Sequence, residues 1–256
     1  MTSGTVDLLP EWEPFADAAR KRRPNGGTWC EAWTVRDIVA HQAGTANELA
    51  RVLLGHMEGD RVPTRSFEER EAPFHAMDDH DLWAATSDGM DHLAEACSGA
   101  LRDLGPEADV GWTGRTMEVA WFAEHMREEL VLHRWDLVGD DRTATLALSE
   151  AWMTEHSVTA VGRPLLIRGL ATLDLGPGVV VEGRLRVRGT DDVVVRATAD
   201  DAGVARGRPQ GRATVESDAA ARVLMLWGRR PSDPSRWRSD AGTEQLRQVR
   251  VLLSGY

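Results

Sequence analysis

The spacing of apolar residues changes once along this chain, and that change separates two classes of structure. Through the first 140 residues, apolar side chains recur at the spacing of an α-helix. Glycine and proline interrupt the pattern at Gly26-Gly27, from Gly59 to Pro73, and at Gly105-Pro106. Helices are therefore predicted at roughly 6–22, 34–56, 79–104 and 115–138. Four helices of this length predict an antiparallel bundle.

Beyond this bundle the pattern changes to that of strands. Residues 179–188 alternate between apolar and charged side chains, a period of two that predicts a half-buried strand. Further strands are predicted at 191–199 and 213–217, and helices at 218–230 and 243–256. The predicted fold class is α plus α+β, a four-helix bundle followed by a small mixed α/β domain. We expect a first domain at 1–145, a linker helix at 146–163 and a second domain at 164–256.

Ionisable side chains lie on the apolar side of the last bundle helix. At about 100° per residue, Glu129 and His133 share the sector of Met126 and Leu130, whereas Arg127 points the other way. A carboxylate without a partner in an apolar interior costs several kcal/mol, so such groups are protonated, paired or bound to a metal. A metal ion would account for a carboxylate and an imidazole one turn apart.

A second histidine comes from the predicted helix at 34–56. Thr34 is its expected N-cap and Asp37 stands at the capping-box position. His41 lies at the margin of the apolar stripe of this helix, which suits a residue that faces a space between helices. With Glu129 and His133 it completes three ligands, and catalytic zinc is typically held by three protein ligands with one position left open.

A purely structural role also fits these residues. A histidine on an apolar face is commonly a hydrogen-bonded core residue, and Glu129 could pair with Arg36 or Arg127 instead of a metal. The spacing alone leaves the two interpretations open.

Charge and hydropathy exclude some classes of partner. The net charge of −11 and the pI near 5.2 are the opposite of a nucleic-acid-binding surface. The sequence has no run of about 18 apolar residues, and its first residues lack the basic and apolar regions of a secretory signal. We therefore expect a cytoplasmic protein with no nucleic-acid or membrane partner.

Two segments together resemble a known family. The segments WTVRDIVAHQAG (33–44) and REELVLHRWDL (127–137) resemble the DinB-like N-terminal domain of the mycothiol-dependent maleylpyruvate isomerase family. In that family a histidine on one helix and an ExxxH or HxxxH pair on a later helix bind a divalent metal, and His41, Glu129 and His133 match those positions. The resemblance covers roughly 1–145. The segment RVLMLWGRRP (222–231) resembles the family's C-terminal domain, which is similar to sterol carrier domains.

The resemblance implies a thiol enzyme with a divalent metal, most readily Zn²⁺, and mycothiol as cosubstrate. A bound cation favours the thiolate, which is the nucleophilic form of a thiol. Among the activities of the family, we prefer an S-transferase that adds mycothiol to a small electrophile. A cis–trans isomerase of the maleylpyruvate type is the alternative. The sequence also permits a non-enzymatic protein that binds an apolar ligand, and a thiol-independent metal hydrolase. The electrophile, the metal and the oligomeric state stay open.

Four further residues are weaker candidates for the site. His125, one turn before Glu129, could replace a ligand or carry a proton. Asp136 could accept the other ring N–H of a ligand histidine. Arg229 could bind an anionic substrate, and Trp33 could line the pocket. Each also has an ordinary interpretation, as an ion pair, a solvated surface charge or a core aromatic residue.

Overall fold

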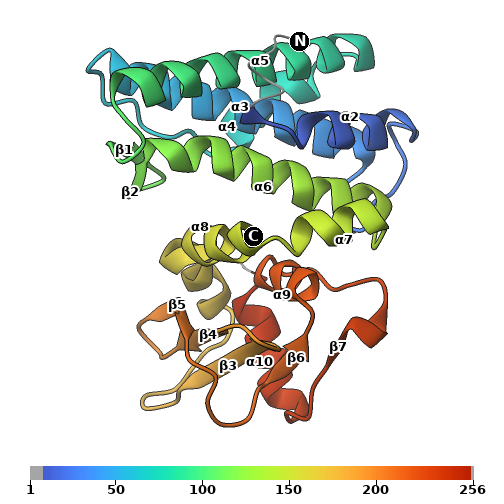
Figure 1. The fold of residues 1–256 in the computed structure, drawn as a ribbon, viewed down its shortest axis with the longest axis vertical. Helices are drawn as coiled ribbons and strands as arrows, with labels where there is room; N and C mark the ends of the chain where they lie inside the picture. The colour runs from blue at the N-terminus through green and yellow to red at the C-terminus, as the bar shows by residue number, and fades with distance from the viewer. Residues whose placement is uncertain (1–7, 255–256) are drawn as a thin grey trace. The chain divides into compact units, whose positions relative to one another are not determined.

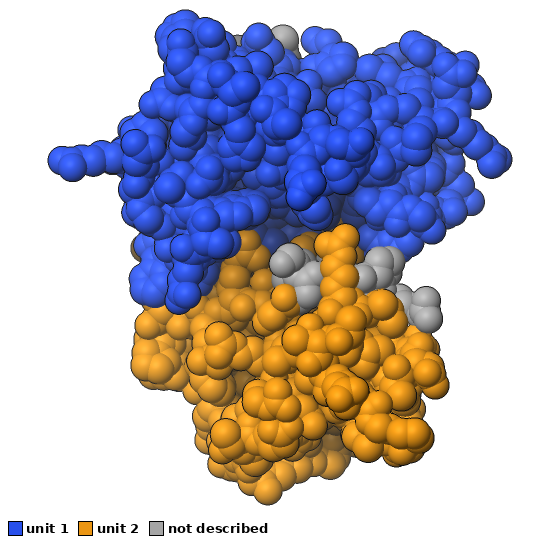
Figure 2. All heavy atoms as spheres, turned by 180° about the vertical axis from the view of Figure 1, so that it is seen from behind, with its two compact units in different colours: residues 1–138 blue, residues 139–256 orange. Residues whose placement is uncertain are grey.

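The computed structural model describes residues 8–254, apart from the side chains of residues 162–165. Contacts divide the chain into two units, one up to Val138 and one from Gly139 onward (Figure 2). The first unit is mainly helical and the second combines a sheet with helices, which confirms the predicted fold class. Residues 145 and 163, the predicted domain boundaries, lie inside helices α7 and α8 of the second unit.

Four helices form the bundle of the first unit (Figure 1). Helix α3 packs against α5 and α6, and α6 packs against α2. Their bounds are Trp12–Arg20 for α2, Val35–Met57 for α3, Asp79–Asp103 for α5 and Val119–Val138 for α6. Residues 6 and 7, where the first helix was predicted to begin, lie outside the described residues. Within the described part of the chain, no helix has both the length and the hydropathy to cross a membrane.

The start of α3 agrees with the expected capping. The Thr34 side chain accepts a hydrogen bond from the backbone N–H of Asp37, and Asp37 Oδ2 accepts one from the backbone N–H of Thr34 at 2.8 Å. The backbone N–H groups of Thr34 and Asp37, at the N-terminal end of α3, thereby have hydrogen-bond acceptors. This capping specifies where the helix begins.

The segment from Gly59 to Pro73, predicted as a break, contains an additional helix. Helix α4 spans Phe67–His75 and begins with a capping box between Ser66 and Glu69. Pro73 lies inside it, and only Arg70 and Phe74 of its residues are buried. A short helix that contains a proline and has few apolar residues shows no clear helical spacing of apolar residues in its sequence. It depends on packing against α3, where Gly44 permits close approach of the backbone.

The predicted start of the last bundle helix at 115 was also wrong. Residues Asp109–Trp112 and Arg115–Glu118 form the antiparallel hairpin β1–β2, and α6 begins only at Val119. The two turn residues, Thr113 and Gly114, have φ values of 47° and 77°. Positive φ at both central residues belongs to the tight turn whose twist matches paired strands, so the chain reverses there before the helix starts.

A five-stranded sheet forms the centre of the second unit. Its strand order is β5-β4-β3-β6-β7, with β3 and β6 parallel and the other neighbours antiparallel. The strands are β3 Val181–Val187, β4 Asp192–Ala197, β5 Ala202–Gly207, β6 Val215–Ser217 and β7 Trp237–Arg238. Strands β3, β4 and β6 correspond to the three predicted strands. Strands β5 and β7 carry no comparable alternation and were not predicted.

Helices of the second unit contact this sheet: α8 Ala151–Leu170, α9 Ala219–Leu226 and α10 Thr243–Leu252. Helix α7 Arg142–Leu148 packs against α9, and a short 3-10 turn lies at Pro234–Arg236. Helix α8 contacts β5, α9 and α10 within the unit. Helices α9 and α10 correspond to the predictions at 218–230 and 243–256, although residues 255 and 256 lie outside the described residues. Gly183 of β3 permits the close approach of α10, since a Cβ there would meet Val249 at 2.6 Å.

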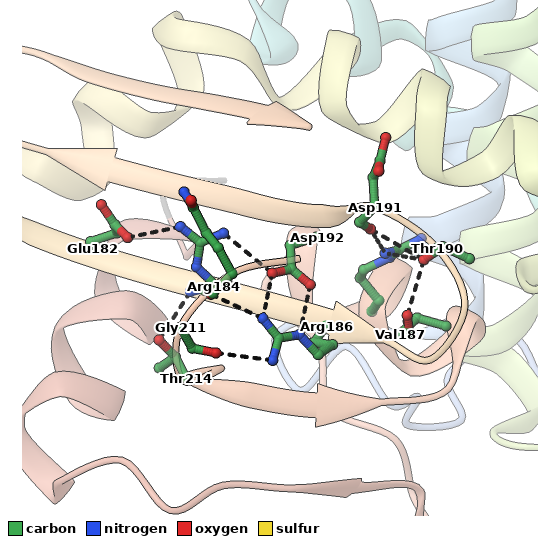
Figure 3. A network of polar contacts seen from close by, with 11 residues as sticks. Glu182, Arg184, Arg186, Val187, Thr190, Asp191, Asp192, Gly211 and Thr214 are labelled. Carbon is green, nitrogen blue, oxygen red and sulfur yellow. Dashed lines mark hydrogen bonds and ion pairs between the residues drawn. The ribbon is translucent and has the colours of Figure 1, made fainter. Parts of the chain in front are cut away.

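The charged side of β3 is partly covered, where the alternation predicted a solvent-facing surface: Arg184 is buried and Arg186 is half-buried, whereas Glu182 is exposed. Asp192 at the start of β4 has a side chain with no exposed surface, and it accepts hydrogen bonds from Arg186 Nε at 2.9 Å and Arg184 Nη1 at 3.2 Å (Figure 3). The hydrogen bonds from Arg186 hold the pKa of Asp192 below its usual value, against the opposing effect of burial, and Arg184 adds to this lowering. A carboxylate thus neutralises two arginines of the neighbouring strand.

Replacing Asp192 with Asn is expected to lower the free energy of unfolding of the full chain by about 3 kcal/mol, because two arginines would lose their shared carboxylate. The full difference in free energy of unfolding between the wild type and Asp192→Asn should be present at neutral pH. It should decline as the pH falls below about 4, because a carboxyl whose pKa is lowered on folding stabilises only while ionised. Urea unfolding at pH 7 and pH 3 measures both effects.

The matched control for this prediction is Glu216→Gln, which breaks an ion pair with the 82% exposed Arg238. Exposed pairs contribute little, so the stability of this variant should stay close to that of the wild type. An Asp192→Asn protein as stable as the control at pH 7 would contradict the assignment of a stabilising role to the buried carboxylate.

Candidate metal centre

Three of the residues singled out by the sequence meet at one point. His41 comes from α3, and Glu129 and His133 come from successive turns of α6. Glu129 Oε2 lies 3.3 Å from His41 Nε2 and 3.3 Å from His133 Nε2. Arg36 and Arg127, the arginines considered as partners of Glu129, pair instead with Asp79 and Glu11. One carboxylate oxygen is therefore shared by two imidazoles at the centre of the bundle.

The other nitrogen of each imidazole lies close to a second carboxylate. His41 Nδ1 lies 2.7 Å from Glu71 Oε1 of α4, and His133 Nδ1 lies 2.8 Å from Asp136 Oδ2 of α6. A carboxylate near Nδ1 favours the proton on that nitrogen, where the N–H can donate to it, and in a neutral imidazole this leaves Nε2 with an unshared electron pair. Glu71 and Asp136 thus favour the tautomer in which both Nε2 atoms can coordinate a cation.

This arrangement fits a divalent metal. With neutral imidazoles, both Nε2 atoms direct electron pairs at an anionic oxygen 3.3 Å away, which is repulsive unless a cation lies between them. Ligands about 2.0–2.1 Å from a tetrahedral zinc ion are separated by about 3.3 Å. All three ligand atoms lie within 4.8 Å of one another. Two imidazoles and one carboxylate are a known donor set for catalytic zinc, which leaves one coordination position for another molecule.

The protein surroundings keep Glu129 ionised. Burial by itself raises the pKa of Glu129, but hydrogen bonds to His133 and His41 outweigh it and hold the pKa well below its usual range. Burial lowers the pKa of His133, and the contacts with Asp136 and Glu129 raise it by more, so its pKa is above the usual value. A metal ion that binds here must therefore displace any proton on His133, which couples its affinity to pH.

Two aromatic rings flank the ligand histidines. Trp33 stacks on His133 with 5.5 Å between ring centroids and lies 4.8 Å from the His41 ring. Phe67 of α4 stacks on His41 at 5.9 Å and is 48% exposed. The rings restrict the orientations of both imidazoles, and the exposed Phe67 marks a side on which the centre approaches solvent. Trp33 thus contacts both histidines, and its predicted role in lining a substrate pocket stays a prediction.

The structure brings some of the remaining candidates close to the centre. His125 Nε2 lies 3.7 Å from Glu129 Oε1, the oxygen that does not contact the two ligand histidines, and its ring stacks on Trp121 at 4.3 Å. This position is compatible with the predicted proton carrier. Arg229 belongs to the second unit, where its guanidinium donates to the backbone carbonyl of Trp227 at 3.1 Å. Its predicted role in binding substrate stays a prediction.

The sequence interpretation missed the contribution of α4. Glu71, Phe67 and Arg70 all lie on this short helix and adjoin the His41 side of the centre. A Cβ at Gly44 of α3 would lie 3.0 Å from the Arg70 carbonyl oxygen and 3.0 Å from Glu71 Cγ. The glycine therefore lets α4 approach closely enough for Glu71 to reach His41. The capping box at Ser66 and Glu69 was the one available signal for this helix.

Comparison with known proteins places the bundle in a family. The family model described as mycothiol maleylpyruvate isomerase N-terminal domain matches residues 8–138. A crystal structure of a histidine-to-alanine mutant of the mycothiol-dependent maleylpyruvate isomerase has a TM-score of 0.63 and 16% identity, and the match covers 94% of this chain and 96% of that chain. A second structure of that isomerase has a TM-score of 0.60 and 17% identity, covering 91% and 94%. At these identities the structures show a shared fold. No curated protein matches the sequence significantly.

Proposed function

The chain belongs to the mycothiol maleylpyruvate isomerase family, and from this premise we propose that it is a mycothiol-dependent cis–trans isomerase with a metal centre at His41, Glu129 and His133. The observation that carries the proposal is the shared Glu129 oxygen, which lies 3.3 Å from an Nε2 atom of each histidine. The relatives support isomerisation over the S-transfer that the sequence had favoured.

The three ligand side chains would hold the cation, and Glu71 and Asp136 would orient the two imidazoles. When bound, a divalent cation such as zinc favours the deprotonated form of a thiol at neutral pH. The ligands are 4%, 9% and 5% exposed for His41, Glu129 and His133, so little water competes with the thiol around them. Trp33 and Phe67 support this exclusion by covering the imidazole rings.

Isomerisation needs the thiol only as a catalyst. The thiolate sulfur forms a bond to one carbon of a cis double bond, whose electron pair moves to an adjacent carbonyl group. Rotation about the resulting single bond follows. The electron pair then returns, the C–S bond breaks, and the trans double bond forms with release of the thiolate. No atom is gained or lost, so one thiol serves many turnovers.

The test measures the fate of both the substrate and the thiol. Zinc-loaded and metal-free protein are each incubated with maleylpyruvate, with and without mycothiol, and the alkene protons are followed by NMR while thiol is titrated. We expect the trans isomer only when zinc and mycothiol are both present, with the amount of free thiol unchanged.

Each other outcome contradicts a particular part of the proposal. Equal turnover in metal-free protein would remove the metal centre from the reaction. Turnover without thiol would indicate a hydrolase or another thiol-independent activity. Consumption of one thiol per product, with an adduct detected by mass spectrometry, would identify an S-transferase instead of an isomerase.

A further inference from the structure

Arg70 on α4 is a buried cation without a hydrogen-bonded partner. Its side chain is 8% exposed, yet its guanidinium makes no hydrogen bond to any described residue, and its Nε atom is buried. Its shortest ion pair is to Glu71, with 3.9 Å between Nε and Oε1. The N–H of Nε is thus a buried donor without an acceptor, and leaving such a donor unsatisfied is costly. Such a group is suited to an anion supplied from outside the chain.

The position of Arg70 connects it to the metal centre. The Glu71 oxygen that lies 3.9 Å from Arg70 Nε is the same oxygen that contacts His41 Nδ1. The guanidinium carbon lies 4.1 Å from the centroid of Phe67, and Phe67 stacks on His41. Arg70 and His41 are thus neighbours of the same carboxylate and the same aromatic ring. An anion at Arg70 would belong to a molecule that also reaches the centre.

The nearby carboxylates do not account for Arg70, because each already has closer partners. Glu48 accepts a hydrogen bond from Arg51 Nη2 at 2.6 Å, Glu71 contacts His41 at 2.7 Å, and Glu129 is shared by two histidines. The hydroxyl of Thr45, one turn after His41 on α3, is also buried without a hydrogen bond. Thr45 lies one turn of α3 from His41, and Arg70 precedes Glu71, which contacts His41; each has a buried polar atom without a hydrogen bond to the described residues.

We propose that Arg70 binds a carboxylate group of the electrophilic substrate. The planar guanidinium can donate two parallel hydrogen bonds to a carboxylate, and stacking against Phe67 restricts the plane in which it does so. This would orient the reacting carbons toward the thiol and favour anionic over uncharged electrophiles. The inference rests on the proposed function, because it takes the His41, Glu129 and His133 centre to be the place of reaction.

The experiment measures maleate binding to zinc-loaded protein by calorimetry, with zinc content determined by mass spectrometry. Maleate presents two carboxylates across a cis double bond, and its uncharged diamide is the control ligand. We expect Arg70→Met to bind maleate at least about tenfold more weakly than the wild type. Arg70→Lys, which keeps the charge but not the planar fork, should lie between the two. Maleamide affinity and zinc content should be alike in all three proteins.

Arg102→Met is the matched control, because it removes the same charge from a side chain that is 71% exposed on α5. It should bind maleate as the wild type does. If Arg70→Met fails to fold, Arg70→Lys decides the question. The proposal would be overturned if Arg70→Met bound maleate as tightly as the wild type. If Arg70→Met does not fold, wild-type maleate affinity in Arg70→Lys would overturn it. Zinc-loaded wild-type protein that does not bind maleate would also overturn it.

The two proposals fail in different ways. A wild-type protein that takes up no zinc contradicts the metal centre, whatever Arg70 does. If the wild-type protein takes up no zinc but still binds maleate, and loses this binding in Arg70→Met, the role of Arg70 as a carboxylate-binding group stands and the proposed metal centre falls.

Discussion

Replacing Glu129 with glutamine is expected to remove high-affinity zinc binding and, with it, the thiol-dependent activity. The amide has nearly the shape of the carboxylate but no charge, and its oxygen is a poor ligand for a cation held by only three side chains. Zinc affinity should fall by more than about 100-fold. Substitution of a residue that only hydrogen-bonds to a metal ligand typically costs up to about 100-fold, and loss of a ligand itself should cost more. Competition with a chelating dye measures the zinc affinity, and the isomerisation assay measures the activity.

The same substitution separates the metal centre from a structural ion pair. If Glu129 served only as the partner of protonated His41 and His133, the glutamine variant would unfold more easily and wild-type protein would hold no zinc. The control is Glu95→Gln, which removes an exposed carboxylate from α5. A Glu129→Gln protein that binds zinc as tightly as the control would contradict the proposed ligand set.

Replacing Glu71 is expected to weaken zinc binding in a graded way. Glutamine keeps an oxygen that can accept from His41 Nδ1, whereas alanine leaves that nitrogen without its partner at 2.7 Å. The expected losses of zinc affinity are about tenfold for Glu71→Gln and about 100-fold for Glu71→Ala, since a carboxylate beside a ligand histidine fixes its ring and raises its basicity. Zinc affinity is measured by the same dye competition.

Glu68→Gln is the matched control, because it removes an exposed carboxylate from the same helix, α4. Its zinc affinity should equal that of the wild type. Helical content and thermal unfolding of the metal-free variants show whether α4 remains in place. Unchanged zinc affinity in a folded Glu71→Ala protein would mean that His41 needs no orientation by this helix.

The proximity of Glu129 and His133, the proposed ligand pair on α6, could be predicted because its geometry is local. Residues four apart on a helix share a face, so Glu129 and His133 are brought together by backbone geometry alone. The start of α3 is local in the same sense, since Thr34 and Asp37 cap it within a single turn. His41 lies 88 residues from Glu129, and that contact depends on how α3 and α6 pack. The position of His41 at the margin of an apolar stripe made it a candidate and the resemblance to a family supported it, but neither pattern could show the contact itself.

The contribution of α4 could not be predicted, because that helix has little pattern of its own. Pro73 and the lack of an apolar stripe made the segment look like a loop. Its stability and position come from contact with α3 at Gly44. The contact of Glu71 with His41 depends on this packing, because the two residues lie 30 positions apart on different helices.

The burial of Arg184 and Arg186 in the sheet also depends on contacts that the sequence pattern does not show. Alternation along β3 correctly indicated a strand, but it assigned Arg184 and Arg186 to a solvent-facing side. Asp192 enters the pairing through the antiparallel register of β3 and β4, which brings an unexposed carboxylate beside both guanidinium groups. Burial of a charge depends on which neighbour covers it, and the period of a strand does not contain that information.

The amino-acid sequence by itself determined the elements whose signals lie within a few residues: capped helices, a strand with period two, and a carboxylate and imidazole one turn apart on α6. Only the tertiary structure showed that His41 lies beside Glu129, that Glu71 contacts His41, and that Arg70 is buried without a hydrogen bond to the described residues. The physical reason is that local signals depend on backbone geometry. The pairing of polar groups far apart in the chain depends on which surfaces exclude water together.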